Sequence, residues 1–167
     1  MENPVTEQTG VPRDRALAAL EASGIDFTIT EHGPVKSLEE AAHVRRVRPQ
    51  DIVKTLVVRR GEGDYLFALI TGDRQISWPK FRKHLGVSRV AMPDASDALA
   101  VTGYVRGTIT PFGSLTAWPV IADAALVGAT VSIGAGAHGV AATVNADQMI
   151  AALGADVADI SEELGGK

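Results

Sequence analysis

The feature that most limits the fold is a run of seven residues, 52–58, which reads Ile-Val-Lys-Thr-Leu-Val-Val. All but the lysine are aliphatic or β-branched, a composition typical of a buried strand. A second apolar run, residues 65–71, follows after the short loop Gly61-Glu62-Gly63-Asp64. Two apolar runs joined by a short loop with glycine predict a β-hairpin, with strands over residues 52–60 and 65–71.

Lys54 lies inside the first of these strands, and no acidic residue accompanies it in the run. Removing an ammonium group from water is costly unless the group is paired or its pKa falls. One interpretation is that the side chain extends along the strand to solvent, at an edge where lysine also opposes aggregation. The other is that Lys54 lines a polar cavity and has a function. The run alone leaves both open.

Capping and glycine signals predict helices between the strands. Pro12 opens a helix that ends at Ser23-Gly24, and Ser37-Leu38-Glu39-Glu40 forms a capping box for a short helix through His43. Further helices are expected over residues 77–86, 95–101 and 146–153, and strands over 26–31, 87–92, 118–122, 130–133 and 140–144. Because strands that are neighbours in sequence alternate with helices, we expect a single-domain α+β fold with a mixed, mostly antiparallel sheet.

Composition narrows the class of protein. A chain of 167 residues, 46% hydrophobic and 22% charged, suits one globular domain. It has no cysteine, which excludes disulfides, thiolate nucleophiles and zinc–thiolate sites and fits a reducing compartment, so the cytoplasm is the expected location. No stretch approaches the roughly eighteen apolar residues of a membrane span, and no secretory signal is visible at the N-terminus.

The charge balance argues against a basic surface over the whole protein but allows local basic patches. The formal net charge is −4, against the strongly basic balance of many nucleic-acid-binding domains. Arginines cluster at Arg45, Arg46 and Arg48, a second basic group is Arg59 and Arg60, and a third spans residues 80–84. Each cluster is either an ordinary solvated face or a phosphate-binding patch.

Metal and nucleophile motifs are missing from the sequence. The four histidines have no metal-ligand spacing, and there is no G-x-S-x-G motif. We therefore expect no metal and no cofactor. His32, at a strand-to-helix turn, and His138, in a glycine loop, are the better candidates among the histidines for a functional site.

Two glycine-rich segments could present backbone amides to an anion. Residues 134–139 match the dinucleotide pattern G-x-G-x-x-G, with Asp159 about twenty residues later. The pattern requires a helix directly after its third glycine, whereas a second strand is expected here, so a hairpin loop is the favoured interpretation and a nucleotide site the alternative. Residues 103–113 hold three glycines and a proline, which indicates either a surface turn or a rigid anion-binding loop.

Taken in order, these segments resemble the YbaK/prolyl-tRNA-synthetase-associated editing domain family. The resemblance is carried by Lys54-Thr55-Leu56 after an apolar residue, by residues 103–113, and by the later strand with Gly136 and Gly139. It extends over residues 11–160, with 1–10 and 161–167 expected to be flexible ends. It implies a sheet with flanking helices and hydrolysis of the ester of a wrongly charged tRNA, typically cysteine or alanine on tRNA for proline. The implied partners are the tRNA acceptor end and prolyl-tRNA synthetase.

The resemblance also implies roles for individual residues. Lys54 corresponds to the family's signature lysine, and we expect it to act electrostatically because a protonated lysine is a poor base. Many members have a serine where this chain has Gly134, so the hydroxyl would have to come from Ser132 or Thr110. The expected catalytic residues are Lys54, Gly107 and Gly136, the substrate-binding residues His32, Thr108, Thr110, Pro111, Ser132 and Gly134, and the tRNA-binding residues Arg45, Arg46 and Arg106. A domain of the same fold that binds tRNA or a synthetase without turnover is the alternative.

Overall fold

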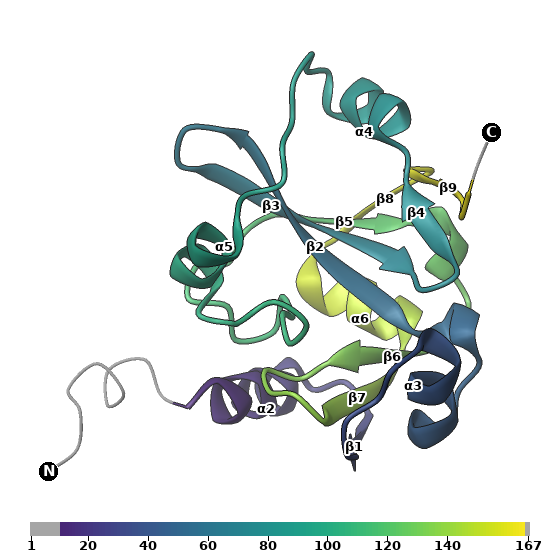
Figure 1. The fold of residues 1–167 in the computed structure, drawn as a ribbon. Helices are drawn as coiled ribbons and strands as arrows, with labels where there is room; N and C mark the ends of the chain where they lie inside the picture. The colour runs from purple at the N-terminus through teal and green to yellow at the C-terminus, as the bar shows by residue number, and fades with distance from the viewer. Residues whose placement is uncertain (1–10, 166–167) are drawn as a thin grey trace, which may run out of the picture.

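The structure, a computed structural model, describes residues 11–165. Its helices and strands follow one another as a single α+β domain, as the sequence predicts (Figure 1). In chain order they are α2 (Pro12–Ser23), β1 (Phe27–Glu31), α3 (Leu38–Arg45), η1 (Pro49–Asp51), β2 (Val53–Gly61), β3 (Asp64–Thr71), β4 (Arg74–Ile76), α4 (Trp78–Leu85), α5 (Ala95–Thr102), β5 (Val120–Asp123), η2 (Ala124–Leu126), β6 (Thr130–Gly134), β7 (Val140–Asn145), α6 (Ala146–Leu153), β8 (Asp156–Ala158) and β9 (Ser161–Glu163). Within this part of the chain, no helix has the length and apolarity needed to cross a membrane.

Two main sheets meet at the strand that carries Lys54. One has the order β2-β3-β5-β8, in which β2 and β3 are antiparallel while β5 pairs in parallel with both β3 and β8. The other, β1-β7-β6, is antiparallel throughout, as is the small pair β4-β9. A bridge between Ile52 and Ser132 links the two main sheets. The predicted mixed and mostly antiparallel arrangement is therefore confirmed.

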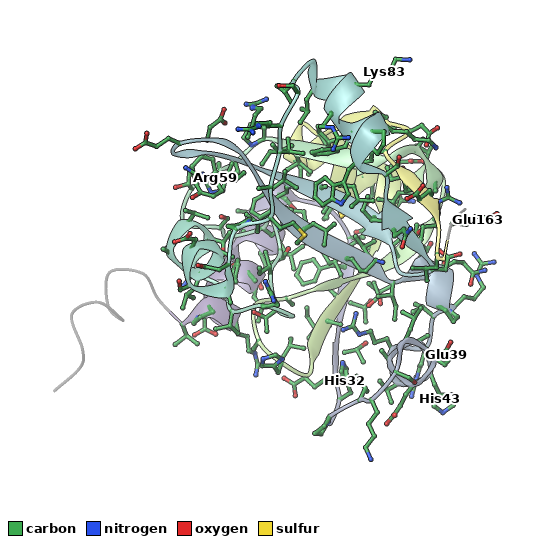
Figure 2. The ribbon with its side chains drawn as sticks, turned by 45° about the horizontal axis from the view of Figure 1, so that its top comes forward. His32, Glu39, His43, Arg59, Lys83 and Glu163 are labelled. Carbon is green, nitrogen blue, oxygen red and sulfur yellow. The ribbon has the colours of Figure 1, made fainter. Side chains whose placement is uncertain are left out.

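The main core lies between the two sheets, where α6 is also found (Figure 1). Side chains alternate along β2, so Val53 and Val57 face this core while Val58 faces a second core under α4, beside Phe81. Charged side chains lie at the periphery, for example Arg59 on the β2–β3 hairpin, Lys83 on α4 and Glu163 on β9 (Figure 2). β2 is thus sandwiched between two apolar layers.

Helix ends agree closely with the sequence signals. Gly24 adopts the left-handed conformation after α2, and Ser37 Oγ accepts a hydrogen bond from the Glu40 amide at 3.0 Å. The reciprocal half of the expected capping box differs, because the Glu40 carboxylate accepts from the amide of Lys36, at 3.2 Å, and not from that of Ser37. The predicted cap is confirmed, with its return bond moved by one residue.

The predicted strand over residues 87–92 is wrong. Only Ala91 is paired there, in an isolated bridge whose amide and carbonyl bond those of Arg59. Pro93 follows directly and has no N–H to extend the pairing.

The prediction of a flexible tail over residues 161–167 is also wrong for its first part. Residues 161–163 form β9, and the Ser161 hydroxyl donates to the buried carboxylate of Asp123 at 2.9 Å. The same carboxylate accepts from the Ile160 amide at 3.0 Å. Because a buried carboxylate needs donors, these bonds hold the end of the chain at the end of β5, while β9 itself pairs with β4. Residues 1–10, expected to be flexible, and 166–167 lie outside the described residues.

The glycine segment 134–139 joins β6 to β7 as an antiparallel hairpin. No helix follows its third glycine, so the anion-binding geometry of a dinucleotide fold does not form there. Asp159, the acidic residue at the expected distance, pairs instead with Lys80 at 3.0 Å. The nucleotide-binding alternative is therefore wrong.

Candidate functional site

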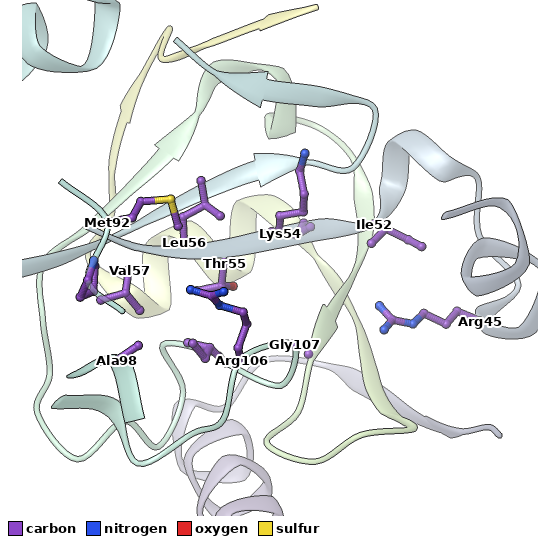
Figure 3. A pocket seen from close by; sticks show the side chains of 14 residues that line it. Arg45, Ile52, Lys54, Thr55, Leu56, Val57, Met92, Ala98, Arg106 and Gly107 are labelled. Carbon is purple, nitrogen blue, oxygen red and sulfur yellow. The ribbon is translucent and has the colours of Figure 1, made fainter. Parts of the chain in front are cut away.

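A cavity of about 360 Å³ lies along the edge of β2 that faces away from β3. That edge is paired at both ends, by Ile52 with Ser132 and by Arg59 with Ala91. Between these two points β2 and β6 separate, and the space is enclosed by α3, α5 and the loop after α5 (Figure 3). The lining residues are Arg45, Ile52, Val53, Lys54, Thr55, Leu56, Val57, Met92, Pro93, Ala98, Arg106, Gly107, Ile109 and Gly134.

Three cationic side chains line this mostly apolar cavity: Lys54, Arg45 and Arg106. None of them takes part in the ion pairs formed within residues 11–165. Figure 3 shows Arg45 and Arg106 on one side of β2, coming from α3 and from the loop, while the Lys54 ammonium points to the other side. Cations that form no ion pair and lie beside an apolar space favour an anionic ligand.

Lys54 is half-buried, and its Nζ donates a hydrogen bond to the carbonyl of Arg74 on β4. Burial lowers the pKa of this lysine, and the nearby negative charge of Asp73 partly opposes that effect. An ammonium has three N–H donors, so the bond to Arg74 leaves two for a ligand. The sequence offered a cavity-lining role for Lys54 as one interpretation. The structure adds the hydrogen bond to the Arg74 carbonyl, which fixes the position of the ammonium.

Replacing Asp73 with asparagine is expected to lower the pKa of Lys54 further, because it removes the charge that favours the ammonium. A folded-state pKa below the ordinary 10.5 means that the unfolded chain holds this proton more tightly. Protonated Lys54 therefore lowers the free energy of unfolding at pH values below its folded-state pKa. This loss disappears as the pH rises from the folded-state pKa to the unfolded value of 10.5. NMR titration of the lysine side chain measures the pKa, with Asp26→Asn as the control; an unchanged Lys54 pKa in Asp73→Asn would contradict the assignment.

Arg45 enters the cavity from the end of α3 and contacts Ser132 of β6. Its Nη1 lies 3.4 Å from Ser132 Oγ, and its Nε is buried without a hydrogen-bond partner. Burial also lowers the pKa of this guanidinium. A buried N–H without an acceptor is costly, so Arg45 is prepared to bind an acceptor that enters the cavity.

The first glycine loop is held rigidly at both ends. Arg15 of α2 donates to the carbonyls of Gly103, at 2.7 Å, and Gly113, at 3.2 Å. Inside the loop, the hydroxyl of Tyr104 donates to the Phe112 carbonyl at 2.7 Å, and burial raises the pKa of Tyr104 to about 12, so it remains a donor. These contacts fix the segment that carries Gly107.

Gly107 and Gly136 have different surroundings. Gly107 has a φ of 90° and is exposed at the rim of the cavity, where a Cβ would lie 3.4 Å from the His138 ring. Gly136 has a φ of 88°, is buried, and lines neither the cavity along β2 nor the one beside His32 and His138. Its amide donates to the Thr108 carbonyl at 3.1 Å, and a Cβ there would lie 2.6 Å from the Pro12 carbonyl oxygen. Gly136 thus connects the two loops and α2.

His32 and His138 line a second cavity, of about 470 Å³, which shares Arg45 and Gly107 with the first. His32 Nδ1 lies 2.8 Å from the Gly33 carbonyl, so Nδ1 carries the hydrogen. The other nitrogen, Nε2, is buried without a hydrogen-bond partner. The two cavities are therefore adjacent, one mostly apolar and one more polar.

The remaining predicted residues are spread around these cavities. Gly134 lines the first, and a Cβ on it would lie 3.3 Å from the Ile109 carbonyl oxygen. The hydroxyls of Thr108 and Thr110 are buried in local bonds, to the Val105 carbonyl at 2.7 Å and from the Phe112 amide at 3.3 Å. Pro111 lines a separate groove. Arg46 is exposed just after α3, outside the lining of all three cavities.

Sequence reasoning missed several lining residues. Met92 is the last residue of the segment predicted as a strand and Pro93 follows it, while Ala98 and Ile109 carry no chemical signal of their own. Thr55 was part of a motif but was given no role, although its Oγ1 is buried without a partner in the cavity wall. Its position next to Lys54 was the signal that could have drawn attention to it.

Comparison with known proteins gives consistent results. The model of a family described as "Aminoacyl-tRNA editing domain" matches residues 32–152. The proline–tRNA ligase of Kosmotoga olearia is 30% identical over 117 residues, which are 70% of this chain and 18% of that protein. The candidate Cys-tRNA(Pro)/Cys-tRNA(Cys) deacylase EbsC of Enterococcus faecalis is 29% identical over 110 residues, 65% of each chain.

Among solved structures, a candidate trans-editing enzyme for prolyl tRNA synthetase has a TM-score of 0.81 and 23% identity, over 97% of this chain and 99% of that one, which shows a shared fold. The chain spans only 14% to 21% of the length of the curated proline–tRNA ligases that it matches.

Proposed function

Because this chain belongs to the aminoacyl-tRNA editing domain family, we propose that it acts in trans to hydrolyse the ester bond of a mischarged aminoacyl-tRNA. The proposed substrate is cysteinyl- or alanyl-tRNA for proline, and the proposed location is the cytoplasm. The name of EbsC supports this substrate class, as do the proline–tRNA ligases among the relatives. The observation that carries the proposal is the apolar cavity with three cations and a rigid glycine loop at its edge.

The proposed reaction is attack of a water oxygen on the ester carbonyl carbon. The bond between that carbon and the ribose oxygen breaks, the ribose oxygen takes a proton, and a free amino acid and an uncharged tRNA result. Arg45 and Arg106, on one side of β2, would bind the terminal phosphate (Figure 3). The Lys54 ammonium, on the other side, would bind phosphate or ribose oxygens with its two remaining N–H donors and favour the negative charge that develops in the transition state (Figure 3). The exposed Gly107 at the rim would let the backbone approach the substrate closely.

The apolar walls of the cavity suit a small, uncharged amino-acid side chain. The walls near β2 are formed by Val57, Ala98 and Ile109, which leave an apolar space beside the backbone. Each methylene group in such a space changes discrimination by about 1–3 kcal/mol, so larger side chains would be rejected by shape. Proline would be spared on the same steric ground.

The proposal is tested by assaying the purified protein on tRNA for proline charged with cysteine, alanine or proline. Release of cysteine or alanine with retention of proline is the expected result, and repeating the assay with prolyl-tRNA synthetase tests that enzyme as a partner. Gly134, at the position where the family resemblance implies a serine, favours a second possibility, a domain that binds without turnover. Tight binding of charged tRNA with no release of any amino acid would establish that alternative.

Neutralising the cavity arginines is expected to weaken tRNA binding in a salt-dependent way. Each phosphate contact on a single strand contributes about 0.7 to the slope of log K against log salt concentration. Arg45→Gln and Arg106→Gln are therefore each expected to reduce that slope by about 0.7 in binding titrations, and Arg46→Gln is measured alongside them. Lys83→Gln, on α4, is the control (Figure 2). Equal slopes for the control and both cavity variants would contradict the proposed role.

A further inference from the structure

The backbone of β2 has polar groups that point into the cavity. In an antiparallel pair, alternate residues direct both their N–H and their C=O toward the partner strand, and the residues between them direct both groups away. Arg59 directs both groups to Ala91, on the side away from β3. Phe67, which lies opposite Val57 in β3, directs its amide to Pro119 on the β5 side.

These contacts determine which residues of β2 direct their backbone groups toward β3 and which direct them away from it. Ile52 directs its carbonyl toward Gly72 on the β3 side, so residues 54, 56 and 58 do the same, and the irregularity in register comes only after Arg59. The N–H and C=O of Thr55 and Val57 therefore point to the open edge, between its two bridges. No group within residues 11–165 is found to bond them on that side. The Thr55 hydroxyl, also unpaired, adds a third polar group at the same residue.

An aminoacyl ester brings its own requirements to this cavity. Its α-ammonium needs hydrogen-bond acceptors, yet none of the lining residues is acidic, and Thr55 Oγ1 is the only side-chain oxygen among them. Lys54, Arg45 and Arg106 would repel the ammonium. The acceptors available on the open edge of β2 are its outward carbonyls, and the donors beside them suit the ester carbonyl.

We propose that Thr55 binds the aminoacyl group itself: its C=O accepts from the α-ammonium and its N–H donates to the ester carbonyl oxygen. The aminoacyl residue would then pair with β2 as an antiparallel strand one residue long. This inference rests on the proposed function and adds to it the residue that binds the acyl group, Thr55, and the backbone groups that recognise the ammonium and the ester carbonyl.

The same geometry explains where the amino-acid side chain goes. Residues that face each other across an antiparallel pair place their side chains on the same face. An L-residue opposite Thr55 would direct its side chain to the face of Val53 and Val57, which Ala98 and Ile109 enclose. A D-residue would direct its side chain to the face of Lys54 and Leu56.

The decisive variant replaces Thr55 by its α-hydroxy acid, so that an ester oxygen takes the place of the N–H while the side chain is kept. The same replacement at Val57 is the matched control, because its N–H also points to the open edge and its side chain is kept. In both variants the preceding carbonyl, which faces β3, becomes an ester carbonyl and a weaker acceptor, so the effect on the ladder is the same. We expect kcat/KM for alanyl-tRNA to fall at least about 10-fold for the replacement at 55 and less than about threefold at 57. Propionyl-tRNA, which lacks only the ammonium, should lose at least about 10-fold with the unmodified protein.

Retained activity in the variant at 55, within about twofold of an active unmodified protein, would overturn the inference and leave the proposed function standing. A larger loss at 57 than at 55 would overturn the assignment to Thr55. A second measurement does not need turnover: titration with 3′-deoxy-3′-(L-alanylamido)adenosine, followed by amide NMR, should shift the Thr55 resonance most. If no charged tRNA is hydrolysed but this shift is seen, the proposed function fails and the binding mode stands; saturation of the analogue without a Thr55 shift overturns the binding mode.

Discussion

Replacing Lys54 with methionine is expected to lower kcat/KM for ester hydrolysis by about 100-fold, the size of loss seen when one preorganised group that stabilises developing charge is removed. Methionine keeps an unbranched stem on β2 and removes only the ammonium that donates to the Arg74 carbonyl. Because the ammonium is already disfavoured by burial, its removal should change the free energy of unfolding by no more than about 1 kcal/mol. Single-turnover deacylation and urea denaturation measure the two effects separately.

Two comparisons make this result specific to the Lys54 charge. Lys54→Arg keeps a cation in a larger, planar form and should retain part of the activity, since an electrostatic role tolerates the change better than proton transfer would. Lys80→Met removes a lysine that pairs with Asp159 outside the cavity and should leave activity unchanged. Full activity in Lys54→Met would show that the ammonium is not required. It would favour the other interpretation of Lys54, a lysine that opposes aggregation at the strand edge.

Replacing Gly136 with alanine is expected to have the largest effect on stability, a loss of about 2–5 kcal/mol. Part of the loss, about 1–2 kcal/mol, comes from placing a Cβ on a residue with a φ of 88°. The rest comes from steric overlap, because that Cβ would lie 2.6 Å from the Pro12 carbonyl oxygen and 3.0 Å from the Tyr104 ring. Backbone atoms held by a helix and a hairpin cannot move aside easily. Urea denaturation followed by circular dichroism measures the loss.

Gly128→Ala is the matched control for this prediction. Gly128 has a similar φ of 80°, but a Cβ there would meet no atom within 4 Å. Its substitution should therefore cost only the conformational part, about 1–2 kcal/mol. Equal losses for the two variants would mean that the contact with α2 contributes nothing and that Gly136 is not the connection between the two loops and α2.

The elements of this fold were largely predictable from sequence because their signals are local. Ser37, Asp94 and Asn145 each accept from a backbone amide three residues later, and glycines end the helices in the left-handed conformation. The β2–β3 hairpin follows from two apolar runs and a glycine loop. In each case the interacting groups lie within a few residues of one another, so the pattern of residue types determines the structure.

The errors arose where pairing depends on distant residues. Residues 87–92 have the composition of a strand, but only Ala91 finds a partner, because the edge of β2 opens into the cavity beyond that point. Residues 161–163 look like a polar tail, yet a buried carboxylate on Asp123, far along the chain, holds them in place. Neither partner can be identified from the local sequence.

The sequence by itself determined that Lys54 lies on a buried strand, that glycine loops follow it, and that their order resembles one family. Only the tertiary structure decided what surrounds the ammonium. It showed that the Arg74 carbonyl binds Lys54, that the Gly136 amide is used by Thr108, and that the open edge of β2 presents Thr55 to the cavity. The physical reason is that residue type and spacing specify local conformation, whereas the hydrogen-bond partner of a strand edge depends on which distant segments pack beside it.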